Sequence, residues 1–169
     1  NSADDLKGLK LRAYSPTTSR LTVLLGATPT TVQTPEIPQA FSTGIIDAMV
    51  TSPSTGVSSQ SWDYISNYTD TQAWIPKNMV IVNLDSFNNL SDASQTAVMS
   101  AARSAEARGW EMAQKETSVK TEMLSEHGIS VAKPSAQLSA DLRAIGKIMG
   151  GEWAEEAGSQ GAAILSAYQ

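Results

Sequence analysis

One arginine, Arg12, is placed where a cation can bind a ligand. Apolar and polar residues alternate over residues 9–14, which predicts a β-strand, and Arg12 lies near its carboxyl end. In open α/β sheets ligands lie beyond the carboxyl ends of the strands, and a guanidinium group binds a carboxylate through two parallel hydrogen bonds. We therefore expect Arg12 to bind a carboxylate group of a ligand. An ordinary salt bridge, at the surface or between lobes, is the alternative.

Two hydroxyl residues follow the end of another predicted strand. The apolar run 45–50 is typical of a strand inside a covered sheet, and Thr51 and Ser52 come directly after it. Their hydroxyl groups could donate hydrogen bonds to a ligand oxygen, although the same residues also suit an ordinary turn. Trp74 lies further along, just before a proline that turns the chain, where its ring would line a pocket or pack in the core.

Residues needed for catalysis are scarce in this sequence. There is no cysteine, and the single histidine, His127, falls in the last turn of a predicted helix, where a capping or surface role suits it. No nucleophile elbow, phosphate-binding loop or dinucleotide-binding motif occurs. The sequence therefore predicts no catalytic residue, no metal site and no cofactor, and it favours binding over turnover.

Composition narrows the class of protein. The chain has 169 residues, of which 41% are hydrophobic and 17% charged, so it is long enough to bury a core. A net charge of −5 with scattered lysines and arginines argues against a nucleic-acid partner. No segment approaches the roughly 20 apolar residues that span a bilayer. The chain begins at Asn1 rather than at methionine, so we expect it to be processed or truncated.

Strands and helices are predicted to alternate in the first part of the chain. An apolar helical face over residues 21–25 stops at Gly26, and the β-branched run 30–33 predicts a strand. Thr34, Pro35 and Glu36 then form a typical helix start, with Thr34 as the cap, before the strand at 45–50. This alternation predicts an α/β fold.

The second part of the chain is predicted to be mainly helical. A short helix through Trp62 is followed by an apolar strand at 79–82, and Ser91 opens a long helix that ends at Gly128. A short strand at 129–132 precedes a helix capped by Ser139, and Gly150-Gly151 separates that helix from a final one.

Several short motifs occur in an order and spacing that resemble one transporter family. They are Lys7-Gly8-Leu9-Lys10-Leu11-Arg12, Gly26-Ala27-Thr28-Pro29, Glu36 with Ala40, Thr43-Gly44-Ile45-Ile46-Asp47-Ala48, Asn83, and Leu90-Ser91. The ordered set is similar to the DctP-like solute-binding subunits of tripartite ATP-independent periplasmic (TRAP) transporters. The resemblance covers the chain from Lys7 to the C-terminal helices.

The resemblance implies a fold and a ligand. It implies a periplasmic-binding-protein-like α/β lobe with a mixed sheet, a long connecting helix and C-terminal helices, closing around an organic anion. Family members pair the arginine at the position of Arg12 with the ligand carboxylate. Where they often have Asn-Pro after a strand, this chain has Thr51-Ser52-Pro53, so a hydroxyl replaces an amide. Trp74 corresponds to a region that contacts ligand in other members.

The resemblance also implies that this chain is the C-terminal half of a longer, two-lobed protein. Residues 1–78 would be mainly the second-lobe α/β core, residues 79–128 a strand and the long connecting helix, and residues 129–169 a C-terminal strand and helices. The strand at 79–82 would then lack neighbours, and an exposed strand edge favours dimerisation.

We therefore expect a non-enzymatic, periplasmic protein that captures a small carboxylate-bearing solute for the membrane permease subunits of a TRAP transporter. Arg12 would bind the carboxylate, Thr51 and Ser52 would provide polar contacts, and Trp74 would form an apolar wall. Two alternatives remain: a small α/β enzyme acting on an organic acid, and a non-catalytic dimerisation module in which Arg12 forms an interface ion pair.

Overall fold

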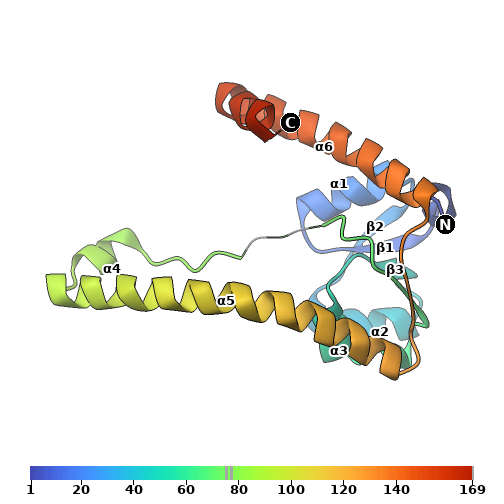
Figure 1. Cartoon of the computed structure of the whole chain (residues 1–169). Coiled ribbons are helices and arrows are strands. Elements are labelled where there is room, and N and C mark those ends of the chain that lie inside the picture. Colours follow the sequence, from blue (N-terminus) through green and yellow to red (C-terminus); the bar gives the residue numbers. More distant parts are fainter. Residues whose placement is uncertain (75, 77, 169) are drawn as a thin grey trace.

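A small parallel sheet forms the centre of the structure, a computed structural model that describes residues 1–74, 76 and 78–168 (Figure 1). Its strand order is β2-β1-β3, with β1 spanning Lys10–Ala13, β2 Thr28–Thr31 and β3 Ala48–Met49. Helix α1 (Pro16–Leu24) connects β1 to β2, and α2 (Ile37–Ser42) connects β2 to β3. Because the chain first moves to one side of β1 and then to the other, these two helices cover opposite faces of the sheet.

Two apolar clusters reflect these two faces. Residues from β1 and α1 pack with a residue of the C-terminal helix in the first cluster, which comprises Leu11, Leu21, Leu25, Ala27 and Ile145. The second cluster lies with α2 and comprises Val32, Ile37, Ala40 and Ile46. Side chains alternate along a strand, so Leu11 faces the first cluster and its neighbour Arg12 faces the second.

Local residues explain where the first helix begins, and it ends before Gly26 as its sequence predicts. Ser15 is the N-cap of α1, and its hydroxyl oxygen accepts a hydrogen bond from the amide of Thr18 at 3.1 Å, while Pro16 occupies the first helical position. Gly26 follows the helix with φ of 71°. The chain thus turns sharply from α1 into β2, which brings the carboxyl end of β1 close to the segment after β2.

A second, two-stranded sheet pairs β4 (Asn67–Thr69) with β5 (Ser130–Ala132). Helix α3 (Pro53–Ser58) packs against the carboxyl end of α5 (Asp92–Glu126), where Gly56 allows close approach to Leu124. A short α4 (Leu84–Asn88) precedes α5, and α6 (Ala136–Tyr168) lies along α1. Figure 1 shows α4 and the start of α5 far from the central sheet.

Three further 3₁₀ segments complete the architecture: η1 (Ala3–Leu6), η2 (Thr34–Glu36) and η3 (Ser61–Asp63). The backbone amide of Ala3 donates to a carboxylate oxygen of Asp141 in α6 at 2.9 Å, which attaches the amino terminus to the C-terminal helix. In the described part of the chain, no helix is both long and apolar enough to cross a membrane.

The α/β fold, the long helix and the C-terminal helices are confirmed. Where a mixed sheet was expected, all strand pairings of the described residues are parallel. The apolar run 45–50 gives only the two-residue β3 at an edge of the sheet, because Ile46 turns into the second cluster and Ile45 stays half exposed.

Four other predictions of secondary structure were wrong. Residues 79–82 form no strand, because no described segment lies beside them to supply a ladder. The predicted short helix through Trp62 is instead η3 followed by β4. The last helix is capped by Ser135 rather than Ser139, since the Ser135 hydroxyl accepts from the amide of Leu138 at 2.9 Å, and it breaks at Gly158 rather than at residues 150–151.

Candidate functional site

Arg12 is a buried cation at the carboxyl end of the central strand. Only 3% of its surface is exposed. Its Nε donates a hydrogen bond to the main-chain oxygen of Val32 at 2.9 Å, and its Nη2 donates to the Oγ1 of Thr34 at 3.3 Å. Both acceptors belong to the segment that follows β2, which pairs with β1 in parallel register.

No carboxylate of the described residues forms a salt bridge with Arg12. Burial lowers the pKa of the Arg12 guanidinium, and the nearby Tyr14 and Tyr64 act in the opposite direction. A guanidinium has five N–H donors, of which the described hydrogen bonds use two. A buried cation with unused donors is costly unless an acceptor completes it, and a carboxylate suits both its charge and its geometry.

Aromatic rings line the surroundings of Arg12. The Cζ of Arg12 lies 4.9 Å from the centroid of the Tyr14 ring, a cation–π distance. The Tyr64 ring stacks on Phe41 with centroids 4.9 Å apart, and its hydroxyl lies 2.6 Å from the Oγ of Ser59. Burial raises the pKa of Tyr64, so this residue remains a neutral phenol.

Thr51 and Ser52 lie in the loop after β3, as predicted, at the same edge of the sheet as the end of β1. Ser52 is the N-cap of α3: its Oγ accepts from the amide of Thr55 at 3.2 Å and lies 3.2 Å from the Thr55 hydroxyl. In the described part of the chain, no hydrogen bond engages the hydroxyl of Thr51. Thr51 therefore has the freer side chain of the two.

Trp74 packs against the first apolar cluster, the one that contains Leu11. Arg12 faces the opposite side of the strand, towards Tyr64 and the second cluster. The structure therefore places the Trp74 ring in the core contact that was the alternative prediction, and it does not bring that ring onto the same sheet face as Arg12.

His127 caps the long helix, as its position in the sequence predicts. It is the C-cap residue of α5, its Nδ1 lies 2.8 Å from the carbonyl oxygen of Met123, and its ring stacks on Trp62 with centroids 3.9 Å apart. Among the described residues, no group of three or more His, Cys, Asp or Glu side chains is arranged to hold a metal ion.

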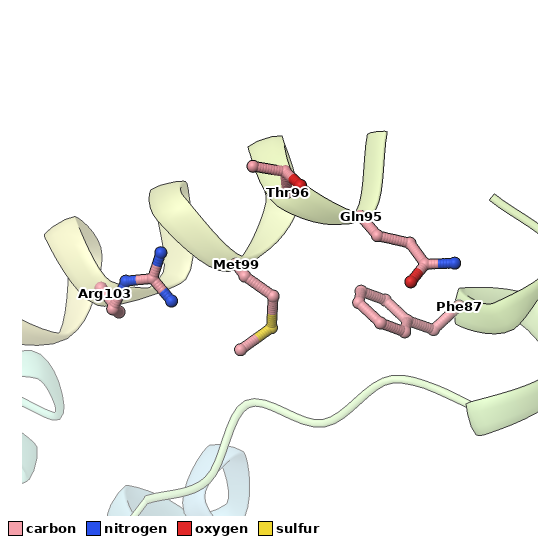
Figure 2. Close-up of a pocket in the computed structure, with 5 residues that line it drawn as sticks. All are labelled: Phe87, Gln95, Thr96, Met99 and Arg103. Carbon is pink, nitrogen blue, oxygen red and sulfur yellow. The ribbon is translucent and has the colours of Figure 1, made fainter. Parts of the chain in front are cut away.

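Two open hollows occur away from Arg12. The first, of about 330 Å³, lies between α4 and the start of α5 and is lined by Phe87, Gln95, Thr96, Met99 and Arg103 (Figure 2). The second, of about 500 Å³, lies between α5 and the two-stranded sheet, with Asp70, Thr121 and Glu122 among its polar lining residues. Neither includes Arg12 or the loop at residues 51–52.

Sequence reasoning missed the partners of Arg12. Thr34 was expected to cap the second helix, but Gln33 occupies the N-cap of η2 and the Thr34 hydroxyl accepts from Arg12 instead. Tyr14 lies two residues after Arg12, on the same side of the predicted strand, which was the only available signal of its proximity. Tyr64 is distant in the sequence and carried no signal.

Comparisons with known proteins identify the family of this chain. The family model for bacterial extracellular solute-binding proteins of family 7, DctP, matches residues 1–155. A search of curated proteins finds no match.

Solved structures include close relatives of the chain. The Bordetella pertussis extracytoplasmic solute receptor DctP7, which binds pyroglutamic acid, is 50% identical with a TM-score of 0.95; the alignment covers 99% of this chain and 56% of that one. DctP6 from the same organism, which also binds pyroglutamic acid, is 42% identical with the same TM-score and coverage. A marine metagenome TRAP solute-binding protein specific for pyroglutamate is 32% identical, with a TM-score of 0.93, over 99% of this chain and 55% of that one.

The chain thus spans a little over half the length of these relatives. The family model matches residues 1–155 and relatives of 32% to 50% identity share the fold over 99% of this chain, so the chain belongs to the DctP family of bacterial extracellular solute-binding proteins.

Proposed function

We propose that this chain is part of a receptor that captures a small organic carboxylate outside the cytoplasm. The observation that carries the proposal is Arg12, a buried guanidinium with no acidic partner among the described residues and with unused donors. Desolvating a cation without a counter-ion is unfavourable, and a ligand carboxylate would supply both the charge and the acceptors. An enzyme acting on an organic acid would also need a general base near Arg12, and the described site offers none.

Pyroglutamate is the ligand that we propose to test first. Three relatives that are 32% to 50% identical over 99% of this chain are described as binding it. Two aromatic residues, Tyr14 and Tyr64, lie near Arg12, and their rings suit a ligand with a small ring attached to a carboxylate. We propose the free hydroxyl of Thr51 and the exposed Ser52 as polar contacts. For Trp74, only the part of the ring that is not packed on the core can face a ligand.

We propose that the protein has two lobes. Residues 1–78 would supply most of one lobe, residues 79–128 the crossing segment and long helix, and residues 129–169 the C-terminal strand and helices. The apolar side chains at 79–82 are between 63% and 105% exposed, and the relatives have further chain beyond the aligned 56%. That further chain would cover these residues and the outer half of α5.

The proposed setting is the periplasm, where the receptor would deliver its ligand to the permease subunits of a TRAP transporter. The family is described as extracellular and solute-binding, which supports a role without turnover. In this 169-residue chain by itself, the exposed segment 79–82 would promote self-association into a homodimer. Replacing Val80 and Ile81 by lysine should lower the sedimentation coefficient from that of a dimer to that of a monomer. A sedimentation coefficient equal to that of the parent chain would contradict the proposed dimer.

Thermal unfolding against a panel of mono- and dicarboxylates tests the proposed ligand class. Pyroglutamate at about 100 times its Kd should stabilise the chain by roughly 2.7 kcal/mol, and Arg12→Ala should abolish that gain. Arg143→Ala, which removes an exposed arginine of α6, serves as the matched control and should respond like the parent. A response of the same size in the parent and in Arg12→Ala would rule out Arg12 as the carboxylate-binding residue.

A further inference from the structure

We infer that Thr34 and Tyr14 are positioning residues for Arg12, and that they leave only the outer edge of its guanidinium, formed by Nη1 and Nη2, for a carboxylate. The inference rests on the proposed function, because it concerns how that same arginine would meet its ligand. It adds two residues and one direction of approach to the proposed site.

The side edge of the guanidinium is occupied by one short segment of the chain. Nε and Nη2 together form this edge, and they donate to the carbonyl oxygen of Val32 at 2.9 Å and to the Thr34 hydroxyl at 3.3 Å. A carboxylate would normally bind either this edge or the outer one with two parallel hydrogen bonds. With the side edge used, two parallel donors remain only at the outer edge.

Tyr14 occupies one face of the same group. Its ring centroid lies 4.9 Å from the Cζ of Arg12, and Tyr14 as a whole is 37% exposed. The Tyr14 amide donates to the Thr18 hydroxyl at 3.0 Å, which fixes the backbone where β1 leads into α1. The ring therefore restricts the guanidinium plane and uses none of the N–H donors of its outer edge.

Holding a flexible arginine in one orientation before the ligand arrives lowers the entropy lost on binding. Thr34 supplies an acceptor that could be replaced without changing the backbone, whereas the Val32 carbonyl could not. Thr34 therefore offers the sharper test of positioning, and Tyr14 offers a second, chemically different one.

At each position, one variant removes the contact with Arg12 and a second variant changes the side chain but keeps that contact. Thr34→Val keeps the branched shape and removes the acceptor, whereas Thr34→Ser keeps the hydroxyl. Tyr14→Leu removes the aromatic face, whereas Tyr14→Phe keeps it. Thr31→Val, at an exposed threonine of β2 outside the contact, is the matched control for loss of a hydroxyl.

The first measurement follows the ¹⁵N-labelled chain by NMR during titration with pyroglutamate. Thr34→Val should raise the Kd about tenfold, as expected for losing a hydrogen bond to a charged group. Tyr14→Leu should raise it about threefold, the size of an exposed cation–π contact. Thr34→Ser, Tyr14→Phe and Thr31→Val should bind like the parent. Parent-like affinity in both Thr34→Val and Tyr14→Leu would overturn the inference.

The second measurement needs no ligand: hydrogen exchange of the Arg12 Nε–H. This proton should exchange more slowly than that of the exposed Arg143, and faster in Thr34→Val and Tyr14→Leu than in the parent. An Arg12 rate equal to that of Arg143 would overturn the inference. If the exchange pattern holds but no carboxylate shifts any resonance of the parent, the proposed function fails while the positioning of Arg12 stands.

Discussion

The Nε of Arg12 donates a hydrogen bond to the main-chain carbonyl oxygen of Val32 at 2.9 Å. This contact joins β1 to the segment that follows β2. It stabilises a buried cation with the dipole of a backbone carbonyl and not with an acidic side chain. A carbonyl offers partial charge only, so the positive charge of Arg12 is left uncompensated by the described residues. A site built in this way retains its attraction for an anion.

A first prediction follows for the stability of the ligand-free chain. Arg12→Met should change the free energy of unfolding by less than about 1 kcal/mol, because removing a buried unpaired charge offsets the hydrogen bonds that are lost. Urea unfolding with a two-state analysis measures this change. The same variant should show no stabilisation by pyroglutamate.

The contrary outcome for Arg12→Met is equally clear. A loss above roughly 3 kcal/mol would show that Arg12 serves mainly to hold β1 and β2 together, because losses of that size are typical of core truncations. Arg143→Met, at an exposed position of α6, provides the baseline for the change of residue type.

A second prediction concerns the contact between α3 and α5. Leu124 is 2% exposed, and a Cβ at Gly56 would lie 3.3 Å from its Cδ2, so the two helices are closely packed there. Leu124→Ala should reduce the free energy of unfolding by about 2–5 kcal/mol. Met112→Ala, at a 57% exposed position of the same helix, should change it by less than about 0.5 kcal/mol. Equal losses in both variants would mean that this contact is absent in solution.

A third prediction concerns acid. The backbone amide of Lys10 donates to the Asp47 carboxylate at 2.9 Å and lowers the pKa of Asp47 below 3.8, with a smaller contribution from the charge of Lys10. Because the folded pKa is lowered, this contribution is fully present above the unfolded pKa and is lost as pH falls through the folded value.

Melting temperatures test the role of Asp47. Asp47→Asn should melt below the parent at neutral pH, and the gap should narrow as pH falls below 3.8. Glu111→Gln, at an exposed position in the middle of α5, is the matched control for replacing a carboxylate by an amide. A gap for Asp47→Asn that stays constant across the whole range would contradict the assignment.

A fourth prediction compares two glycines. Gly128 has φ of +89° and follows the end of α5, where its amide donates to the Ser125 carbonyl at 2.9 Å and the next amide to that of Leu124 at 3.0 Å. Gly128→Ala should cost about 1–2 kcal/mol because a side chain is strained at this φ. Gly146 lies inside α6 with no atom within 4 Å of a built Cβ, so Gly146→Ala should stabilise by up to about 1 kcal/mol. Denaturant unfolding measures the free energy of unfolding of both variants. A change of the same sign in both would contradict this prediction.

Local signals predicted much of the fold. Gly26 after α1, Ser91 at the start of α5 and Gly128 after its end all act through neighbours within one helical turn. Residues 79–82 and Gly150-Gly151 misled the prediction, since a β-branched run forms a strand only beside another strand, and glycines are tolerated inside a helix that is otherwise favourable.

The sequence by itself determined the α/β class, the family resemblance and the choice of Arg12 as the candidate cation for a carboxylate, because these depend on residue types and short-range spacing. Only the tertiary structure decided what Arg12 touches. It moved the Thr34 hydroxyl from an expected cap to the guanidinium, set Tyr14 beside it and placed Trp74 on the opposite face of the sheet. These relations depend on strand order and on which face each side chain takes, and both are fixed only when distant segments pack together.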